Sequence, residues 1–414
     1  MSHNVGMQTS PPFRVCSLVL TCFLLSTCQR QRDFEPPQES VTYQFQNRDA
    51  WKLENDRLRV SILHGGGHIA EIVLKTASGD SVNPLWVPPW PSIDPWTFDV
   101  DKHGSIYGTN SESALLSGIM GHNLCFDFWG PPSETEFQAG MSYHGEVSIL
   151  KAEKVVQTES HLTHRLNLTQ SATAITRTMT LVPGQSVLYV EETAESRISR
   201  DKLFGWVQHA TFGPPFVNPE TVYFDASATQ GDLGGEDYKS LGTWPVGSPG
   251  KGQEDYRRFS QEAPSGKMAY FLMDPERDLE FVTAINTEYQ LLIGYLFWRA
   301  EYPWMMVWEE NQKLMTPPWN GETMTRGMEF GNTRIPGSAK EYFKKHEMYG
   351  TPTFEWLNAR SKLTKRYLVF MAKIPDGMTG VQNVELEGSE IVVKAKGVTE
   401  TLRIAYDPSL FPRP

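Results

Sequence analysis

The stretch Arg57-Leu-Arg-Val-Ser-Ile-Leu63 decides the fold class of this chain. Its apolar residues alternate with polar ones, which is typical of a strand with one face on a hydrophobic core. Three glycines at 65–67 then interrupt the chain, and a second apolar run begins at residue 69 and ends at residue 74. Two such runs separated by a glycine break predict an antiparallel hairpin.

Runs of the same kind recur along the whole chain. They are bounded by Gly, Pro and Asn turns and lie at 146–157, 161–168, 174–181, 187–195, 203–212, 268–273, 279–285, 289–298, 305–309, 323–330, 366–372, 381–386, 390–395 and 401–405. Residues 337–347 and 356–364 are the only short helix candidates, and residues 230–252, rich in Gly and acidic residues, predict a mobile surface loop. The pattern predicts an all-β fold of sheets packed on sheets. A propeller is disfavoured because no repeat of fixed signature is present.

Composition restricts the classes of protein and partner. The chain has 414 residues, of which 21% are charged and 39% hydrophobic, so it is a globular chain with one large β domain or a large domain with appendages. The net charge is −11 and no basic stripe is present, which argues against nucleic acid as the main partner. No apolar run reaches the roughly 18 residues that a membrane-spanning helix needs.

The N-terminal segment resembles an export signal. An apolar stretch lies between Arg14 and Arg30 and ends in Leu25-Ser-Thr-Cys28, which is similar to a bacterial lipobox, although Thr27 replaces the usual Gly, Ala or Ser. We therefore expect a signal peptide at 1–28 and an exported protein that is periplasmic or anchored in the bacterial envelope through a lipid on Cys28. The alternative is a misassigned start of a cytosolic protein.

The rest of the chain is expected to hold one domain. Residues 29–48 are polar and predict a tether, and residues 49–414 predict the β domain, with about 380–406 as an added β-hairpin unit. Cys125 is the only cysteine after Cys28, so this domain has no intrachain disulfide and no cysteine-based zinc site.

Four segments carry residues suited to chemistry. His144 precedes a glycine, His209 lies in a strand that runs into a Pro-Pro turn, and His122 and Asn123 follow a glycine-rich stretch. Glu329 is the sharpest anomaly, because it stands between Met328 and Phe330 in an apolar strand. Neighbouring strand residues point to opposite faces, so Glu329 faces a groove or solvent if its neighbours face the core. A buried, unpaired carboxylate has a raised pKa, as a general base needs, whereas a solvated strand face and a core histidine are the plain alternatives.

We expect neither metal nor nucleotide cofactor. His144, His209 and Glu329 are types that can bind zinc or iron, but nothing in their spacing requires it. The sequence has no Walker loop and no G-x-G-x-x-G after a strand.

Taken in order, these segments resemble the aldose 1-epimerase (galactose mutarotase-like) superfamily. The first hairpin, the pair His144-Gly145, the strand Trp206-Val-Gln-His209 and the late strand Gly327-Met-Glu329 resemble the family's successive motifs over about residues 50–375. The resemblance implies a large antiparallel β supersandwich. It also implies epimerisation of a sugar at its anomeric carbon, with Glu329 as base and His209 as acid.

The resemblance also implies sugar contacts. These are His144, His122, Asn123, Trp206 and Asp255, with Trp86, Trp90 and Trp96 as further stacking candidates. Two departures stand out: His209 is followed by Ala-Thr-Phe-Gly-Pro-Pro rather than Pro-Tyr-Phe, and Gly121-His122-Asn123 lacks the arginine that the family places there.

Three other functions remain open. The chain could be a carbohydrate-binding protein without catalysis, a structural envelope protein, or a sugar-active lyase or hydrolase in which Glu309 or Glu310 supplies a second carboxylate. The discriminating observation is whether His144, His209 and Glu329 share one pocket.

Overall fold

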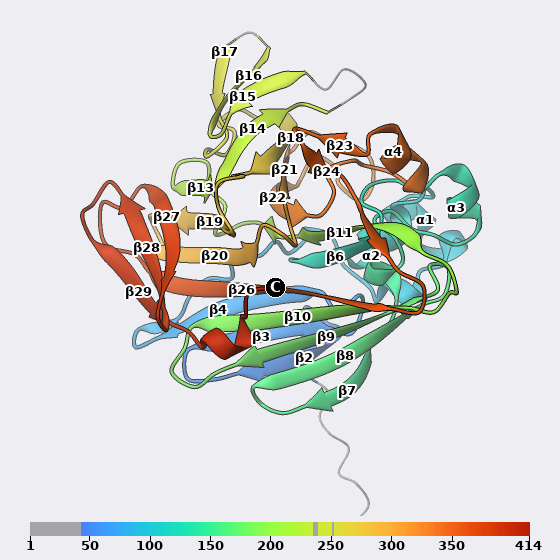
Figure 1. The fold of residues 1–414 in the computed structure, drawn as a ribbon, viewed down its shortest axis with the longest axis horizontal. Helices are drawn as coiled ribbons and strands as arrows, with labels where there is room; N and C mark the ends of the chain where they lie inside the picture. The colour runs from blue at the N-terminus through green and yellow to red at the C-terminus, as the bar shows by residue number, and fades with distance from the viewer. Residues whose placement is uncertain (1–42, 235–238, 251) are drawn as a thin grey trace, which may run out of the picture. The chain divides into compact units, whose positions relative to one another are not determined.

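The computed structural model describes residues 43–234, 239–250 and 252–414 (Figure 1). The predicted signal peptide at 1–28, including Cys28, and most of the predicted tether at 29–48 lie outside the described residues. Strand pairing already begins at Gln44, within the last residues of that tether.

The N-terminal sheet contains the predicted hairpin. Its strands are, in spatial order, β1 (Gln44–Phe45), β2 (Arg48–Glu54), β3 (Leu58–Leu63), β4 (Ile69–Thr76) and β5 (Gly79–Asp80). Leu58, Val60 and Ile62 are fully buried, as their alternation predicts. Gly66 and Gly67 take φ of 63° and 61° in the turn between β3 and β4, a conformation that favours glycine.

Two large sheets form the body of the fold. The eight-stranded sheet runs in the order β13 (Val222–Ala226), β19 (Leu279–Asn286), β20 (Leu291–Trp298), β26 (Lys362–Lys373), β10 (Val187–Ser196), β9 (Thr173–Leu181), β8 (His161–Leu168) and β7 (Glu153–Gln157). The eleven-stranded sheet contains β17 (Gly252–Asp255), β16 (Val246–Gly250), β15 (Ser240–Thr243), β14 (Ala228–Asp232), β18 (Ser265–Met273), β21 (Trp304–Asn311), β22 (Met324–Gly331), β11 (Lys202–His209) and β25 (Glu355–Leu357), with β12 (Thr211–Phe212) on β22 and β6 (Asn123–Asp127) on β11.

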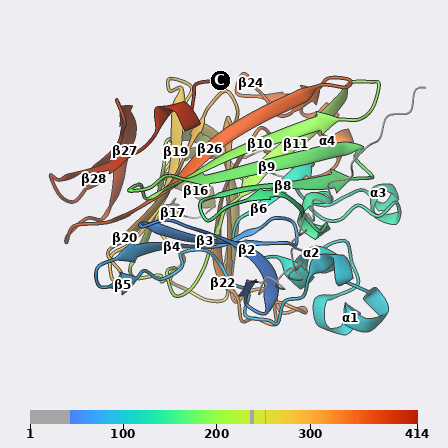
Figure 2. The same cartoon turned by 90° about the horizontal axis from the view of Figure 1, so that it is seen from below.

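The strand ladders of these sheets are antiparallel, and one hydrophobic core joins the three sheets. Ile62 of β3, Leu166 of β8 and Phe330 of β22 belong to that core. Figures 1 and 2 show the resulting layers, with β2–β4 and β8–β10 below the strands β11, β21 and β22 in the view of Figure 1. The all-β class predicted from the alternation is confirmed, and so is the large antiparallel β supersandwich that the family resemblance implied.

Residues at the C-terminal end form a small separate sheet. Its strands are β27 (Gly380–Glu387), β28 (Glu390–Lys396) and β29 (Thr401–Ala405), so the region expected as a hairpin unit has three strands. Val384 and Ile391 pack against Tyr189 and Phe370 of the eight-stranded sheet in a second core. This sheet projects at the left of Figure 1.

The helices are few and short. They are α1 (Val100–Tyr107), α2 (Ser113–Gly118), α3 (Glu134–Gln138) and α4 (Ala339–Lys344), with 3-10 turns at Pro95–Thr97, Val147–Ile149 and Pro408–Leu410 and a two-stranded sheet of β23 (Glu347–Met348) and β24 (Thr351–Pro352). The helix predicted at 356–364 is wrong, because those residues end β25 and begin β26. The predicted loop at 230–252 instead supplies most of β14, β15 and β16, which project at the top of Figure 1. None of the helices in the described residues is long and apolar enough to cross a membrane.

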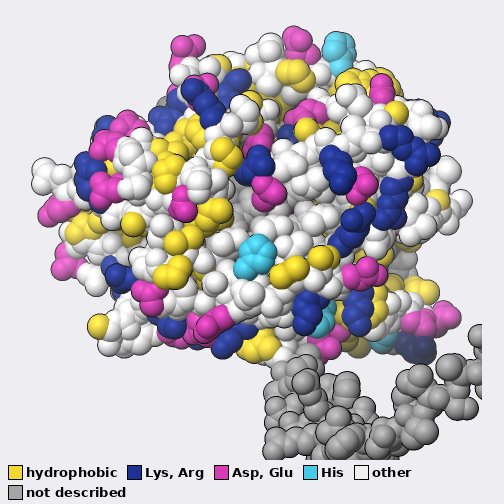
Figure 3. Space-filling model, turned by 60° about the horizontal axis from the view of Figure 1, so that its bottom comes forward, with side chains coloured by type: hydrophobic (Ala, Val, Ile, Leu, Met, Phe, Trp, Pro, Cys, Tyr) yellow, Lys and Arg dark blue, Asp and Glu magenta, His cyan; other side chains and the backbone are white. Residues whose placement is uncertain are grey.

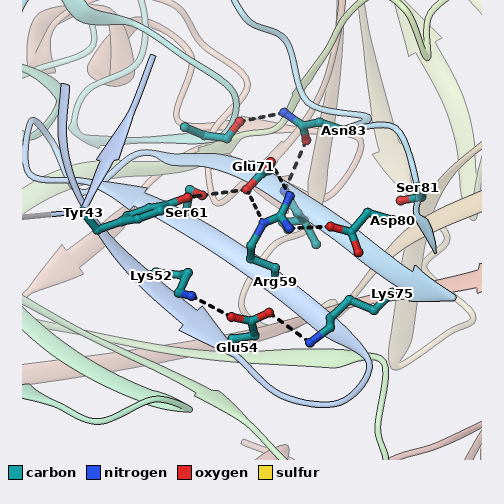
Figure 4. A network of polar contacts seen from close by, with 12 residues as sticks. Tyr43, Lys52, Glu54, Arg59, Ser61, Glu71, Lys75, Asp80, Ser81 and Asn83 are labelled. Atoms are coloured by element: carbon teal, nitrogen blue, oxygen red, sulfur yellow. Dashed lines mark hydrogen bonds and ion pairs between the residues drawn. The ribbon is translucent and has the colours of Figure 1, made fainter. Parts of the chain in front are cut away.

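The outer face of the N-terminal sheet carries a network of charges (Figure 4). Arg59 donates two hydrogen bonds to the Glu71 carboxylate, with N–O distances of 3.1 and 3.2 Å, and also forms an ion pair with Asp80. Figure 3 shows that acidic and basic side chains are interspersed over the face that it presents. The Arg59–Asp80 pair of this network is partly exposed, and an exposed pair stabilises a fold by only about 0–1 kcal/mol.

Candidate active site

A cavity of about 420 Å³ opens on one face of the eleven-stranded sheet. Strand register sets its floor: Glu329 of β22 lies opposite Met306 of β21, and Trp308 lies opposite Met268 of β18. Cross-strand partners point to the same face, so these side chains share one side of the sheet. Met328 and Phe330 point to the other side and belong to the main core, which confirms the predicted orientation of Glu329.

Glu329 is fully buried in this floor. Its Oε2 accepts a hydrogen bond from Trp129 Nε1 at 2.6 Å. Its Oε1 lies 3.2 Å from His209 Nε2 but has no aligned hydrogen bond among the described residues, so it is able to bond a ligand. Burial raises the pKa of Glu329 to about 8, and the Trp129 N–H opposes this shift by favouring the anion.

His209 ends β11 beside Glu329. Its Nδ1 lies 2.8 Å from Thr211 Oγ1, whose hydroxyl donates back to the His209 carbonyl at 3.3 Å. Since the Thr211 hydrogen is used in that bond, Nδ1 carries the imidazole hydrogen and Nε2 presents its lone pair to Glu329. Burial lowers the pKa of His209 to about 4.

His144 faces the same pair from a loop. Its Nδ1 accepts the backbone N–H of Gly130 at 2.9 Å, so a neutral His144 carries its hydrogen on Nε2. Its ring centroid lies 5.1 Å from that of His209. Burial, reinforced by His209, lowers the pKa of His144 well below its usual value. His144 is therefore a neutral hydrogen-bond donor.

The backbone at residues 144–145 is unusual and explains the His-Gly pair. His144 has φ 64° and Gly145 has φ 82°, both in the left-handed region. A Cβ on Gly145 would lie 2.0 Å from the carbonyl oxygen of Phe126. Glycine is therefore required at 145 for the loop to approach β6 and present His144.

Pairing between distant loops brings Trp129 to Glu329. Gly337 N–H donates to the Trp129 carbonyl at 2.6 Å, and His144 N–H donates to the Gly130 carbonyl at 2.9 Å. These bonds hold the segment after β6 across the cavity from β22.

Sequence reasoning missed several cavity residues. They are Glu112, Trp129, Tyr143, Tyr270, Trp308 and Trp319. The turn signal Trp129-Gly-Pro-Pro132 and the position of Tyr143 next to His144 were available in the sequence. No local pattern indicates Glu112, which immediately precedes α2.

Several predicted sugar contacts lie elsewhere. Trp206 is three residues before His209, so it points to the opposite face, where it is fully buried and donates to Glu192 Oε2 at 3.0 Å. Strand parity alone excludes it from the cavity that His209 lines, and we do not retain it in the site.

His122 and Asn123 are also outside the cavity lining. His122 is fully buried in the core and lies 3.0 Å from Gln208 Oε1 through its Nε2. Asn123 opposes His209 in the ladder, but its side chain donates to Ser148 Oγ at 3.1 Å. Both side chains serve internal packing in this structure, so neither is kept as a ligand contact.

Asp255 lies on β17, at the far edge of the eleven-stranded sheet, and pairs with Arg257 at 2.8 Å. It does not line the cavity. The structure therefore does not bring Asp255 together with His209 and Glu329.

The predicted tryptophan candidates form a second layer or lie apart. Trp86 stacks on Trp319 at 6.0 Å, and Trp90 meets Trp319 edge-on at 5.1 Å, so both support a cavity residue from behind. Trp96 lies apart from the cavity, and Lys151 Nζ lies over its ring, 5.2 Å from the ring centroid.

Neither Glu309 nor Glu310 joins the cavity. Glu309 forms a buried ion pair with Arg326. Glu310 lies on the Glu329 face by register, but its carboxylate accepts the backbone N–H groups of Lys313 and Leu314 at 2.5 and 2.7 Å. Within the described residues, no three His, Cys, Asp or Glu side chains are arranged to hold a metal ion.

Solved structures with the same fold as this chain are known, although sequence comparison finds no relative. No family model and no curated protein matches the sequence. Solved structures do match: a galactose mutarotase-like protein from Clostridium acetobutylicum has a TM-score of 0.54 at 10% identity, covering 80% of this chain and 98% of the other.

Two further structures give the same result. A galactose mutarotase related enzyme from Lactobacillus acidophilus has a TM-score of 0.51 at 12% identity, covering 79% of this chain and 98% of the other. An aldose epimerase homologue from C. elegans has a TM-score of 0.52 at 10% identity, covering 79% and 99%. The chain thus has the same fold as these galactose mutarotase-like structures.

Proposed function

We propose that the protein epimerises a sugar or sugar derivative at its anomeric carbon by acid/base ring opening and closure. The observation that supports this most is the buried contact of His209 with Glu329, 3.2 Å apart at the bottom of a cavity. The fold that this chain shares with mutarotase-like proteins agrees with the proposal.

The protonation of the pair suits the reaction. With His209 titrating at about 4 and Glu329 at about 8, the two groups share one proton at neutral pH, and that proton resides on Glu329. One acid and one base are what ring opening of a hemiacetal needs. In the ligand-free pair the acid is thus the carboxyl, which reverses the roles expected from the family resemblance.

The chemistry is then a proton exchange. The unprotonated partner takes the proton of the anomeric hydroxyl, the C1–O1 bond becomes a carbonyl, the bond from C1 to the ring oxygen breaks, and the protonated partner gives its proton to that oxygen. After rotation about C1–C2, the ring oxygen attacks the other carbonyl face and both protons return. The pair holds one proton throughout.

His144 and Trp129 assist without changing protonation. His144 offers its Nε2 hydrogen to an oxygen of the substrate, and Trp129 holds the Glu329 carboxyl in place. Such fixed donors stabilise charge that develops during the reaction.

The test is polarimetry of fresh α-glucose, α-galactose and 6-deoxyhexoses with the purified protein. We expect acceleration over a buffer blank, lost by at least about 100-fold in Glu329→Gln and in His209→Asn. Glu134→Gln, which alters an exposed carboxylate on α3, serves as the control. Acceleration that survives in both site variants would refute the assignment.

A carbohydrate-binding protein without turnover is the second candidate. It is favoured by one observation: among the described cavity residues, none is the arginine or lysine that would help to hold a sugar. The same absence disfavours a uronate lyase, which needs a group to neutralise the carboxylate.

We propose further that the protein acts after export to the bacterial envelope, on the basis of the segment ending in Cys28.

A further inference from the structure

The walls of the cavity offer few hydrogen bonds. Among the described residues, seven aliphatic, thioether or proline side chains line it: Leu115, Leu116, Ile119, Pro131, Met268, Leu314 and Pro336. Trp308 and Trp319 add aromatic surface and meet edge-on at 5.9 Å. In the described lining no Ser, Thr, Asn or Gln side chain is present, and the hydroxyl groups of the lining are those of Tyr143 and Tyr270. An ordinary hexose, which bears a hydroxyl on nearly every carbon, would place hydroxyls against this apolar surface, where they lose their bonds to water.

The charges of the lining have one sign. The His209–Glu329 pair holds one proton and is net neutral at neutral pH, so Glu112 is the charged group of the described lining, which contains no Lys or Arg. Glu112 is partly buried, and its side chain has no hydrogen bond or ion pair among the described residues. Burial raises the pKa of Glu112. An anionic ligand would meet Glu112 without a compensating cation, whereas an amino or hydroxyl group would give Glu112 a partner.

We propose that the substrate is a hemiacetal sugar with few free hydroxyls, deoxygenated or O- or N-alkylated, without negative charge, and that Glu112 binds its remaining hydroxyl or amino group. This proposal rests on the proposed function and names its substrate class. The apolar face of such a sugar lies against Trp308 and Trp319, while its anomeric hydroxyl and ring oxygen meet His209 and Glu329.

Binding is measured separately from turnover, by quenching of tryptophan fluorescence, because Trp308 and Trp319 line the cavity. Two matched pairs of probes are compared: galactose with 6-deoxygalactose, and glucose with 3-O-methylglucose. Glucuronate and the amino sugar glucosamine add a negatively charged probe and an amino probe. We expect the deoxy and methyl forms to bind at least about ten-fold tighter than their parents, and glucuronate to bind weakest.

Glu112→Gln tests the polar contact. We expect at least about a ten-fold loss of glucosamine affinity and a gain for glucuronate, with little change in Glu134→Gln. Parent hexoses that bind as tightly as the deoxy forms, glucuronate that binds best, or failure of every probe to bind would each overturn the substrate class.

The two proposals fail in different ways. Selective binding of the deoxy and methyl forms without acceleration of their anomeric equilibrium would keep the ligand class and refute epimerisation. Acceleration of galactose and 6-deoxygalactose with equal affinity would keep epimerisation and refute the ligand class.

Discussion

Replacing Trp129 by Phe removes the indole N–H that holds Glu329. That N–H donates to Oε2 at 2.6 Å, and Trp129 is only 3% exposed. A hydrogen bond to a charged group contributes about 1.5–3 kcal/mol. One pKa unit corresponds to about 1.4 kcal/mol. The bond favours the carboxylate anion, so its loss raises the pKa of Glu329 by about one to two units above its value of about 8.

This shift is measured in the pH dependence of the rate. The proton of the His209–Glu329 pair is lost as pH rises through the pKa of Glu329, so the alkaline limb of the profile moves upward in Trp129→Phe. Trp304→Phe is the matched control, because Trp304 is equally buried and its indole donates to the Pro352 carbonyl instead, at 2.7 Å. A carbon-13 NMR titration of the Glu329 carboxyl gives the same pKa without turnover. An alkaline limb that stays at the same pH or shifts to lower pH would refute the reasoning.

Three further substitutions follow from the structure. Gly327→Ala puts a Cβ 2.9 Å from Glu329 Oε1, and the backbone at residue 327 is not in the left-handed region. We therefore expect a rate loss of up to about 100-fold with an unchanged melting temperature. A normal rate would show that the carboxylate tolerates displacement. In Gly145→Ala the new Cβ would lie 2.0 Å from the Phe126 carbonyl oxygen, and φ at residue 145 is 82°. Urea unfolding should therefore show a free energy of unfolding lowered by more than about 1 kcal/mol, and an unchanged value would contradict the geometry. Glu280 is fully buried, neither of its oxygens has an aligned hydrogen bond, and Arg277 Nε lies 3.9 Å from its Oε2. Burial raises the pKa of Glu280 to about 8, so its contribution to stability is present below the unfolded value near 4.5 and is lost as pH rises through 8. Glu280→Gln should therefore stabilise the fold by a few kcal/mol at pH 9 and little at pH 4, and a constant difference between these two pH values would argue against it.

The all-β class could be predicted from the sequence because it depends on alternation, whereas the supersandwich was implied by the family resemblance. The hairpin of β3 and β4 and the orientation of Glu329 both follow from the two-residue period of a strand. Applied to β11, the same rule separates Trp206 from His209. The segment at 230–252 was misjudged, since glycine-rich strands carry little alternation.

The walls of the site could not be predicted in this way. Trp129 reaches Glu329 because backbone bonds join residues 129 and 337, and Glu112 reaches the cavity through a loop between two short helices. Such long-range pairings leave no periodic trace in the chain.

The pH–rate profile of anomeric interconversion, followed by polarimetry against buffer-matched blanks, tests the one-proton pair most directly. With His209 at about 4 and Glu329 at about 8, the account predicts a bell-shaped profile with limbs near these two values. Below the lower limb the pair has no base, and above the upper limb it has no acid. A rate that keeps rising beyond pH 9, or a profile unchanged in His209→Asn and Glu329→Gln, would contradict it.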